Sequence, residues 1–215
     1  MKMRNSLVPD GYVDLGVYQP GKSAMEVAQL IALELRIKID SSAETLTVNS
    51  TDAKPKNTYA GNYGFDKLPL HTDLAHWHIP PRYLMLRCAV ADPQVFTLLL
   101  HHREVVEKLS PVVVDRALFR LRRRLDGKMF LLRLRDSGIF RWDQLFLTPE
   151  NIEADQVQSL MTSHNPGFKI MELALDKPGR TVVIDNWNIL HGRSMVKNYS
   201  SPRCIERAYF TEDKV

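Results

Sequence analysis

Residues 168–185 read Phe-Lys-Ile-Met-Glu-Leu-Ala-Leu-Asp-Lys-Pro-Gly-Arg-Thr-Val-Val-Ile-Asp, and they set the expected fold class. Two runs of strand length, 168–175 and 181–185, flank a turn at Asp176–Arg180. Similar runs are found at residues 83–91, 130–135 and 203–210. Many short strands without regular strand–helix alternation favour a closed or sandwiched antiparallel sheet over a doubly wound one. The sequence therefore predicts a mainly β fold with added helices.

Helical patterns occupy other parts of the chain. Ser23 and Glu26 form a capping box before apolar residues that recur every three or four positions, which predicts a helix over residues 23–36. Further helices are expected at residues 103–109, 115–125 and 151–164. Residues 40–64 are rich in Ser, Thr, Asn, Lys and Gly, which is typical of a loop and of a mobile flap over a site.

The length of the chain, 215 residues, fits one domain. We therefore expect a single domain over residues 1–215. Within it, residues 1–60 are expected to supply a helix and loop elaboration, and residues 61–215 the β-rich core. A helical insert is expected within this core, over about residues 103–165.

Composition excludes several classes of protein. The hydrophobic fraction of 44% is too high for a disordered chain, and the apolar runs are far shorter than the roughly 20 residues of a membrane helix. Residues 1–6 carry positive charge, but Pro9 and Asp10 follow where a signal peptide would be apolar. Cys88 and Cys204 form no Cys-x-x-Cys pair, so neither a disulfide framework nor a cysteine zinc site is indicated. We expect a cytoplasmic protein without a membrane partner.

The net charge of +4 is mild. The basic residues concentrate at Arg116, Arg120, Arg122, Arg123 and Arg124, with Leu and Phe between them. This pattern favours an amphipathic helix with a solvated basic face over a nucleic-acid-binding patch. We therefore expect a small-molecule partner and no nucleic acid, and the sequence leaves a homo-oligomer open.

Three residues suggest a metal site. His71 and Asp73 lie two positions apart on a predicted strand, so both side chains are expected on one face while Thr72 points away. His191, at the end of an apolar run, offers a third ligand. Two histidines and one carboxylate on one face leave three open positions on octahedral iron(II), the arrangement of non-haem oxygenases.

The open positions predict a second feature. A 2-oxo acid would fill two of them through its keto oxygen and one carboxylate, and dioxygen would take the third. The far carboxylate of that acid then needs a planar cationic fork, which Arg provides bidentately and Lys does not. Arg203, which follows His191 in the sequence, is placed to supply it.

Three segments carry a resemblance to a known family. They are Leu68-Pro-Leu-His-Thr-Asp-Leu-Ala75, Pro80-Pro-Arg-Tyr-Leu-Met-Leu-Arg-Cys88 and Ile184-Asp-Asn-Trp-Asn-Ile-Leu-His-Gly-Arg193. Together they resemble the iron(II)- and 2-oxoglutarate-dependent dioxygenases of the taurine dioxygenase (TauD/TfdA) type, over roughly residues 60 to 211. The resemblance implies a double-stranded β-helix (jelly roll, cupin-like). It also implies oxidative decarboxylation of 2-oxoglutarate coupled to hydroxylation, or a related C–H oxidation, of a small amino-acid-like or anionic metabolite.

The resemblance also implies roles for individual residues. His71, Asp73 and His191 would bind Fe(II), and O₂ would be the oxidant. Thr97 and Arg203 would bind 2-oxoglutarate, and Arg207 would meet an anionic group of the prime substrate.

Three further observations bear on this transfer of roles. Gln94-Val95-Phe96 replaces the Gly-Gly that the family usually has before the threonine, and the stretch between Thr97 and His191 is short for the family. Retention of Asp73 disfavours the halogenating branch, because a chloride ion would have no vacant ligand position.

Two alternatives remain open from the sequence. Gly16-Val-Tyr-Gln-Pro-Gly-Lys22-Ser23 matches the phosphate-loop pattern and would make the chain a nucleotide hydrolase. The bulky Tyr18 and Gln19 and the lack of a following series of parallel strands argue against it. The second alternative is a catalytically inactive binding protein on the oxygenase fold.

Overall fold

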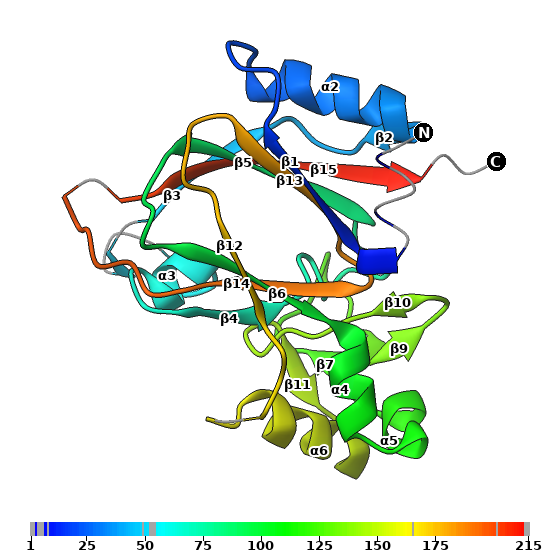
Figure 1. The fold of residues 1–215 in the computed structure, drawn as a ribbon. Coiled ribbons are helices and arrows are strands. Elements are labelled where there is room, and N and C mark those ends of the chain that lie inside the picture. Colours follow the sequence, from blue (N-terminus) through cyan, green and yellow to red (C-terminus); the bar gives the residue numbers. More distant parts are fainter. Residues whose placement is uncertain are drawn as a thin grey trace.

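Two antiparallel β-sheets face each other in the computed structural model, which describes residues 3, 7, 9–48, 50–51, 55–164, 166–200 and 202–212 (Figure 1). The larger, six-stranded sheet has the order β1-β13-β5-β15-β2, and β3 also pairs with β15. Its strands are β1 (Tyr12–Val17), β2 (Ile37–Ile39), β3 (Glu44–Thr47), β5 (Tyr83–Val90), β13 (Arg180–Asp185) and β15 (Cys204–Glu212).

The smaller, four-stranded sheet has the order β12-β6-β14-β4. Its strands are β4 (Leu68–His71), β6 (Phe96–His101), β12 (Met171–Ala174) and β14 (Ile189–Arg193). The turn at residues 176–180 carries the chain from β12 in this sheet to β13 in the larger one.

A hydrophobic core fills the space between the two sheets. Leu84 and Leu86 of β5 belong to it together with Leu99 of β6 and Leu173 of β12, and all are buried. Side chains alternate along a strand, so each sheet directs one row of apolar residues inward. The expected sandwiched antiparallel architecture, a double-stranded β-helix with added helices, is confirmed.

Helix α2 (Ala24–Leu35) covers the outer face of the larger sheet (Figure 1). Ser23 caps it through the capping box with Glu26 that the sequence predicted. The buried face of α2 includes Val27 and Ile31, which belong to a core that also contains Met85 of β5. The predicted helix 23–36 is therefore confirmed to within about one residue at each end.

The phosphate-loop alternative finds no support in the structure. Strands β1 and β13 are antiparallel, whereas a phosphate loop belongs to a parallel sheet. The loop after β1 directs carbonyl oxygens inward, and the buried guanidinium of Arg87 donates to those of Tyr18 and Gln19 at 2.6 and 3.2 Å. A phosphate cradle presents backbone N–H groups instead. Lys22 pairs with Glu26 across 3.8 Å on the surface.

The insert packs beneath the smaller sheet (Figure 1), and the two share a hydrophobic core that includes Phe119 and Trp142 of the insert and Leu100 and Leu190 of the sheet. Its helices are α4 (His102–Lys108), α5 (Pro111–Arg116) and α6 (Ile152–Met161). Its strands are β7 (Leu118–Leu121), β8 (Leu131–Arg133), β9 (Arg135–Asp136), β10 (Ile139–Phe140) and β11 (Leu147–Pro149).

The predicted helix over residues 115–125 is wrong. Helix α5 ends at Arg116, and β7 begins two residues later. In β7 the exposed Arg120 lies between the buried Phe119 and Leu121 in the sequence, and this alternation is the period-two pattern of a strand. Pairing with β8 and β11 on either side outweighs the local helical preference of the arginine-rich segment.

The amino-terminal part of the chain contributes more than a helix and loops. Strands β1, β2 and β3 all come from residues 1–60, and all three pair with strands of the larger sheet. The stretch 40–64, expected as a loop, contains β3 and the short helix α3 (Tyr59–Tyr63). The charged residues 1–6, apart from Met3, and residues 49 and 52–54 lie outside the described part.

No described helix is both long and apolar enough to cross a membrane.

Candidate metal centre

Strands β4 and β14 place two histidines side by side. His71 and His191 are direct partners in the register of this antiparallel pair, and their ring centroids lie 4.5 Å apart. Gly192 permits the close approach, because a Cβ atom there would lie 2.6 Å from the carbonyl oxygen of Leu68. Backbone pairing therefore brings these two side chains together from distant parts of the sequence.

Asp73 reaches the same place from a turn. Strand β4 ends at His71, so the prediction that both His71 and Asp73 lie on a strand is wrong for Asp73. Asn186 holds this turn, since its Oδ1 accepts from the amide of Asp73 at 2.8 Å and its Nδ2 donates to the Asp73 carbonyl at 3.0 Å. Leu74 then adopts a left-handed backbone with φ 56°, an uncommon conformation for leucine that such fixed contacts sustain.

Thr72 points away from the histidines, as the sequence predicted. Its hydroxyl accepts from the backbone amide of Trp142 at 3.2 Å.

Three potential ligand atoms converge in this way. One atom each from His71, Asp73 and His191 lies within 4.8 Å of the others, and the three residues are only 2–6% exposed. Nε2 of His71 is 3.2 Å from Oδ1 of Asp73, and Nε2 of His191 is 3.6 Å from Oδ2. The structure thus brings together the three residues that the sequence predicted as metal ligands.

Hydrogen bonding at His71 fits a metal ligand. Nδ1 of His71 lies 2.9 Å from the carbonyl oxygen of Pro69, which can only accept, so Nδ1 carries the proton and Nε2 is directed at Asp73. A nitrogen lone pair and a carboxylate oxygen repel each other at 3.2 Å. A cation between them removes this repulsion, and it is either a second proton on the ring or a metal ion. The donor set therefore fits a divalent transition metal.

The protonation of the three groups is coupled. Burial alone would raise the pKa of Asp73, but the positive charge of Arg207 and the two histidines lower it well below its usual range. Burial opposes charge on both rings. It lowers the pKa of His191, whereas at His71 the hydrogen bond to Asp73 together with the charges of Asp73 and Asp143 outweighs burial and raises the pKa. Asp73 is therefore a carboxylate at neutral pH, as a metal ligand must be.

Two side chains of the larger sheet orient the Asp73 carboxylate from the opposite side. Arg207 and Tyr209, both on β15, donate to its Oδ2 at 3.0 and 2.8 Å. Second contacts of this kind fix ligand orientation at metal sites. The second terminal nitrogen of Arg207 bonds Glu44 at 3.1 Å, so both ends of the guanidinium, which was expected to meet a substrate anion, contact carboxylates of the chain.

A cavity of about 630 Å³ opens beside the three residues, between the sheets. Thr97 and Arg203 line it together, and Nη1 of Arg203 donates to the Thr97 hydroxyl at 3.1 Å. Both are buried, at 1% and 3% exposure. The structure therefore places these two residues in one cavity with His71, Asp73 and His191, and Arg207 lines the same cavity.

Helix α3 lies against the site from the segment expected to be a flap. The Tyr59 ring packs on His71 with centroids 4.4 Å apart, and its hydroxyl donates to the buried carboxylate of Asp143. Burial raises the pKa of both Tyr59 and Asp143.

Sequence reasoning missed the supporting residues Tyr59, Asp143, Asn186 and Tyr209. For Tyr209 a signal existed, since it lies two positions after Arg207 on a predicted strand and so shares its face. The other three come from turns and a short helix, whose side-chain directions have no such periodicity.

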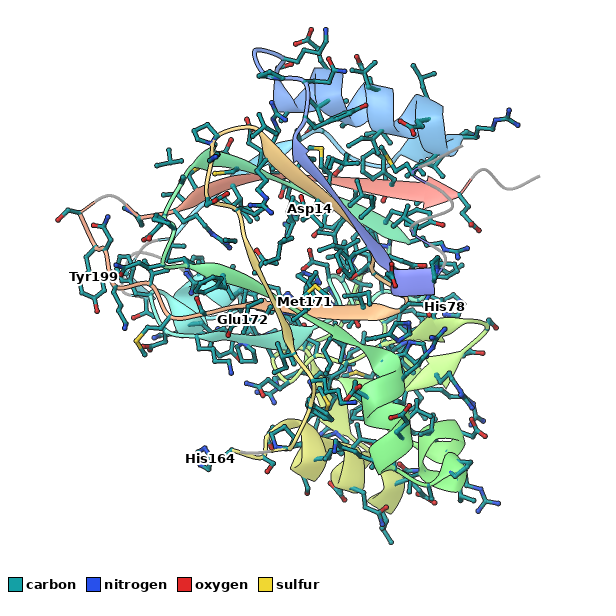
Figure 2. The ribbon with its side chains drawn as sticks, in the orientation of Figure 1. Asp14, His78, His164, Met171, Glu172 and Tyr199 are labelled. Atoms are coloured by element: carbon teal, nitrogen blue, oxygen red, sulfur yellow. The ribbon has the colours of Figure 1, made fainter. Side chains whose placement is uncertain are left out.

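The remaining histidines are separate from the three ligand candidates. His76 lines the cavity and packs on Phe146 with ring centroids 4.8 Å apart, while His78 is exposed. Figure 2 shows His164 at the outer end of the insert, beyond α6 and away from the two sheets.

No protein-family model and no curated protein sequence matches the chain. Solved structures do match. An asparagine oxygenase in complex with Fe(II), 2S,3S-3-hydroxyasparagine and succinate has a TM-score of 0.72 at 19% identity, over 97% of this chain and 76% of that one. The non-haem iron oxygenase OrfP, in complex with Fe and alpha-ketoglutaric acid, has a TM-score of 0.71 at 16% identity, over 99% and 79%.

PvcB, an Fe, alpha-ketoglutarate dependent oxygenase from an isonitrile synthetic pathway, has a TM-score of 0.65 at 13% identity, over 99% of this chain and 82% of that one. At such identities the similarity concerns the fold. The chain adopts the double-stranded β-helix fold of the iron- and 2-oxoglutarate-dependent oxygenases.

Proposed function

We propose that the chain is an Fe(II)- and 2-oxoglutarate-dependent dioxygenase. The observation that carries this proposal is the convergence of His71, Asp73 and His191 within 4.8 Å at a cavity between the sheets. In this role the three residues hold the metal ion through two imidazole nitrogens and one carboxylate oxygen. When bound, iron(II) supplies the dioxygen chemistry that couples oxidative decarboxylation of 2-oxoglutarate to oxidation of a C–H bond.

The chain's own residues bind, orient and exclude water. Arg203 and Thr97 bind the far carboxylate of 2-oxoglutarate, because a guanidinium and a hydroxyl in a dry pocket form charge-assisted hydrogen bonds with it. Asn186 holds the backbone of Asp73, and Tyr209 and Arg207 keep its carboxylate turned toward the histidines. The Tyr59 ring shields His71 from solvent.

The substrate in this proposal is a small amino-acid-like or anionic metabolite. Supporting this, Arg207 lines the cavity, and its partner Glu44, 3.1 Å away, is exposed, so a substrate carboxylate can replace Glu44 as the partner of the guanidinium. The solved relatives were crystallised with 3-hydroxyasparagine and (3S)-hydroxy-L-Arg, which are themselves amino acids. Arg207 remains the proposed contact for the substrate anion, in addition to its contact with Asp73.

Further expectations belong to the same proposal. The TauD/TfdA type is the branch that the sequence motifs favour. A single domain over residues 1–215 accords with the pairing of β1, β2 and β3 into the larger sheet. A reducing cytoplasmic environment accords with two free, buried cysteines, Cys88 and Cys204. A homo-oligomer remains open.

An anaerobic titration tests the proposal. Protein with Fe(II) and 2-oxoglutarate should develop the visible charge-transfer colour of a chelated 2-oxo acid, and on admission of air it should form succinate. His191→Ala should abolish the colour and Arg203→Ala should weaken it. His78→Ala, which removes an exposed histidine outside the cavity, serves as the matched control and should behave as the unchanged protein.

The same titration separates the alternatives. Colour without succinate in the presence of candidate substrates would favour a binding protein on this fold. Absence of colour in a folded protein that takes up no Fe(II) would contradict the proposal. Nucleotide hydrolysis that is lost in Lys22→Ala would restore the phosphate-loop alternative.

A further inference from the structure

Two arginines that line the cavity are buried, and neither has a carboxylate partner in the described part of the chain. Arg193 is 7% exposed and Arg203 is 3% exposed, and both line the cavity. Their hydrogen-bond acceptors are backbone carbonyls and one hydroxyl, and no carboxylate of the described residues lies within 4 Å of either guanidinium. Burying a cation is costly unless an anion compensates it.

Thr97 links the two arginines. Arg193 on β14 is the direct register partner of Thr97 on β6, so their side chains leave the sheet on the same face. Thr97 in turn accepts a hydrogen bond from Arg203 at 3.1 Å. His191 lies two positions before Arg193 on the same strand and therefore faces the same cavity.

Arg193 also has unused hydrogen-bond donors. Its Nη2 donates to the carbonyl oxygens of Gly64 and Asp66 at 2.7 and 2.6 Å. Its Nε and Nη1 are buried and have no partner among the described residues. The N–H groups on two of its three nitrogens thus lack an acceptor within the described ranges, a state that a ligand can relieve.

The positive charges of Arg193 and Arg203 repel each other. Burial lowers the pKa of Arg203 to about 10, and the nearby charge of Arg193 contributes to this lowering. A ligand anion between the two guanidiniums would offset both their repulsion and the cost of burying them.

We propose that Arg193 is a second arginine of the co-substrate pocket, and that Arg193 and Arg203 together bind the distal carboxylate of a 2-oxo dicarboxylic acid around Thr97. This inference rests on the proposed function, because that function supplies the 2-oxo acid. Two cations around one carboxylate make the site selective for a dicarboxylate over a 2-oxo monocarboxylate such as pyruvate.

Calorimetry on the full chain tests the proposal. Dissociation constants for 2-oxoglutarate and pyruvate are measured anaerobically with Fe(II)-loaded protein. Arg193→Gln should weaken 2-oxoglutarate binding about tenfold to a hundredfold and leave pyruvate binding unchanged, because only the distal carboxylate is affected. Arg103→Gln, which removes an exposed arginine outside the cavity, should change neither constant.

A metal-free readout complements the calorimetry. Glutarate, which keeps both carboxylates but lacks the keto group, should raise the unfolding temperature of the unchanged protein more than that of Arg193→Gln. If Arg193→Gln does not fold, the Nε–H resonance of Arg193 in ¹⁵N-labelled unchanged protein, assigned by its loss in Arg193→Lys, should shift on addition of glutarate. Absence of that shift would overturn the proposal.

The outcomes separate the two levels of inference. Wild-type 2-oxoglutarate affinity in a folded Arg193→Gln that still takes up Fe(II) would overturn the role of Arg193 and leave the oxygenase proposal standing. The opposite outcome is that the unchanged protein takes up no Fe(II) while its response to glutarate still depends on Arg193. That result would contradict the oxygenase proposal and support a dicarboxylate site.

Discussion

Tyr209 shows how a residue that is not itself a ligand candidate can control the metal centre. Its hydroxyl donates at 2.8 Å to Oδ2 of Asp73, in a site where Asp73 is 2% exposed. Tyr209→Phe removes this donor and frees the carboxylate to rotate. We expect about tenfold weaker Fe(II) binding, measured anaerobically by competition with a chelator. Tyr199→Phe, at an exposed tyrosine, should retain full affinity, and equal affinities in both variants would contradict this role.

His101 should make stability depend on pH. It caps α4, because its Nδ1 accepts from the amide of Arg103 at 3.2 Å, and this requires an unprotonated nitrogen. Burial, followed by the charges of His102 and Arg103, lowers the pKa of His101 from 6.5 to about 4. The unfolded chain therefore binds the proton first, and stability should fall as the pH drops from about 6.5 toward 4.

Denaturant unfolding at pH 7 and pH 5 checks this prediction. His101→Asn keeps a capping side chain that does not titrate, so it should lose less stability between the two pH values than the unchanged protein. His164→Asn, at an exposed histidine in the insert, should retain the original pH dependence. Identical pH dependence in His101→Asn and the unchanged protein would rule out His101 as the source.

At the scale of elements, the pairing of β4 with β14 depends on Gly192. A Cβ atom there would meet the carbonyl oxygens of Leu68 and Pro69 at 2.6 and 3.1 Å, and backbone cannot give way as a flexible side chain can. Gly192→Ala should cost about 1 to 3 kcal/mol in the free energy of unfolding. Because the shift also separates His71 from His191, Fe(II) affinity should fall with it.

Gly127→Ala is the matched control for this prediction. Gly127 has φ 74° and open space around its would-be Cβ atom, so the substitution should cost about 1 kcal/mol in backbone strain and leave metal affinity intact. Denaturant unfolding measures the stability of both variants, and metal titration measures their Fe(II) affinity. Full Fe(II) affinity in a destabilised Gly192→Ala would contradict the link between strand pairing and the site.

The elements themselves were predictable where local patterns and pairing agree. The apolar runs at residues 83–91 and 181–185 became β5 and β13, and the capping box fixed the start of α2. The segment 115–125 was not predicted correctly, since pairing with neighbouring strands makes its middle part the strand β7. Strand β3, in a polar stretch, owes its existence to pairing with β15, which no local pattern reveals.

The candidate site was predictable to a similar degree. His71, Asp73 and His191 were identified because a metal needs these donor types, and the fold brings them together. Arg193 was overlooked, although the period of a strand puts it on the same face as His191. Its importance became visible only from burial and unpaired donors, which are properties of the packed structure.

At the scale of the whole molecule, the site joins the two sheets. The two histidines belong to the smaller sheet, whereas Arg207 and Tyr209, which contact Asp73, belong to β15 of the larger one. A metal ion that binds only the folded state should therefore stabilise the molecule as a unit. At a hundredfold excess over the dissociation constant this gain is about 2.7 kcal/mol, or roughly 5 to 10 °C in Tm.

Thermal unfolding with and without Mn(II), under conditions that exclude oxidation, measures this coupling. His191→Ala should remove most of the shift, while His78→Ala should retain it. A shift of the same size in His191→Ala would mean that the ion binds elsewhere.

The central claim is that side chains from two separated segments hold one metal ion. A crystal structure of the protein grown anaerobically with Fe(II), with anomalous diffraction data at the iron edge, tests it most directly. We predict a single strong anomalous peak within about 2.0 to 2.2 Å of Nε2 of His71, one oxygen of Asp73 and Nε2 of His191. An ordered site without that peak, or with the His191 ring turned away from the ion, would contradict the account.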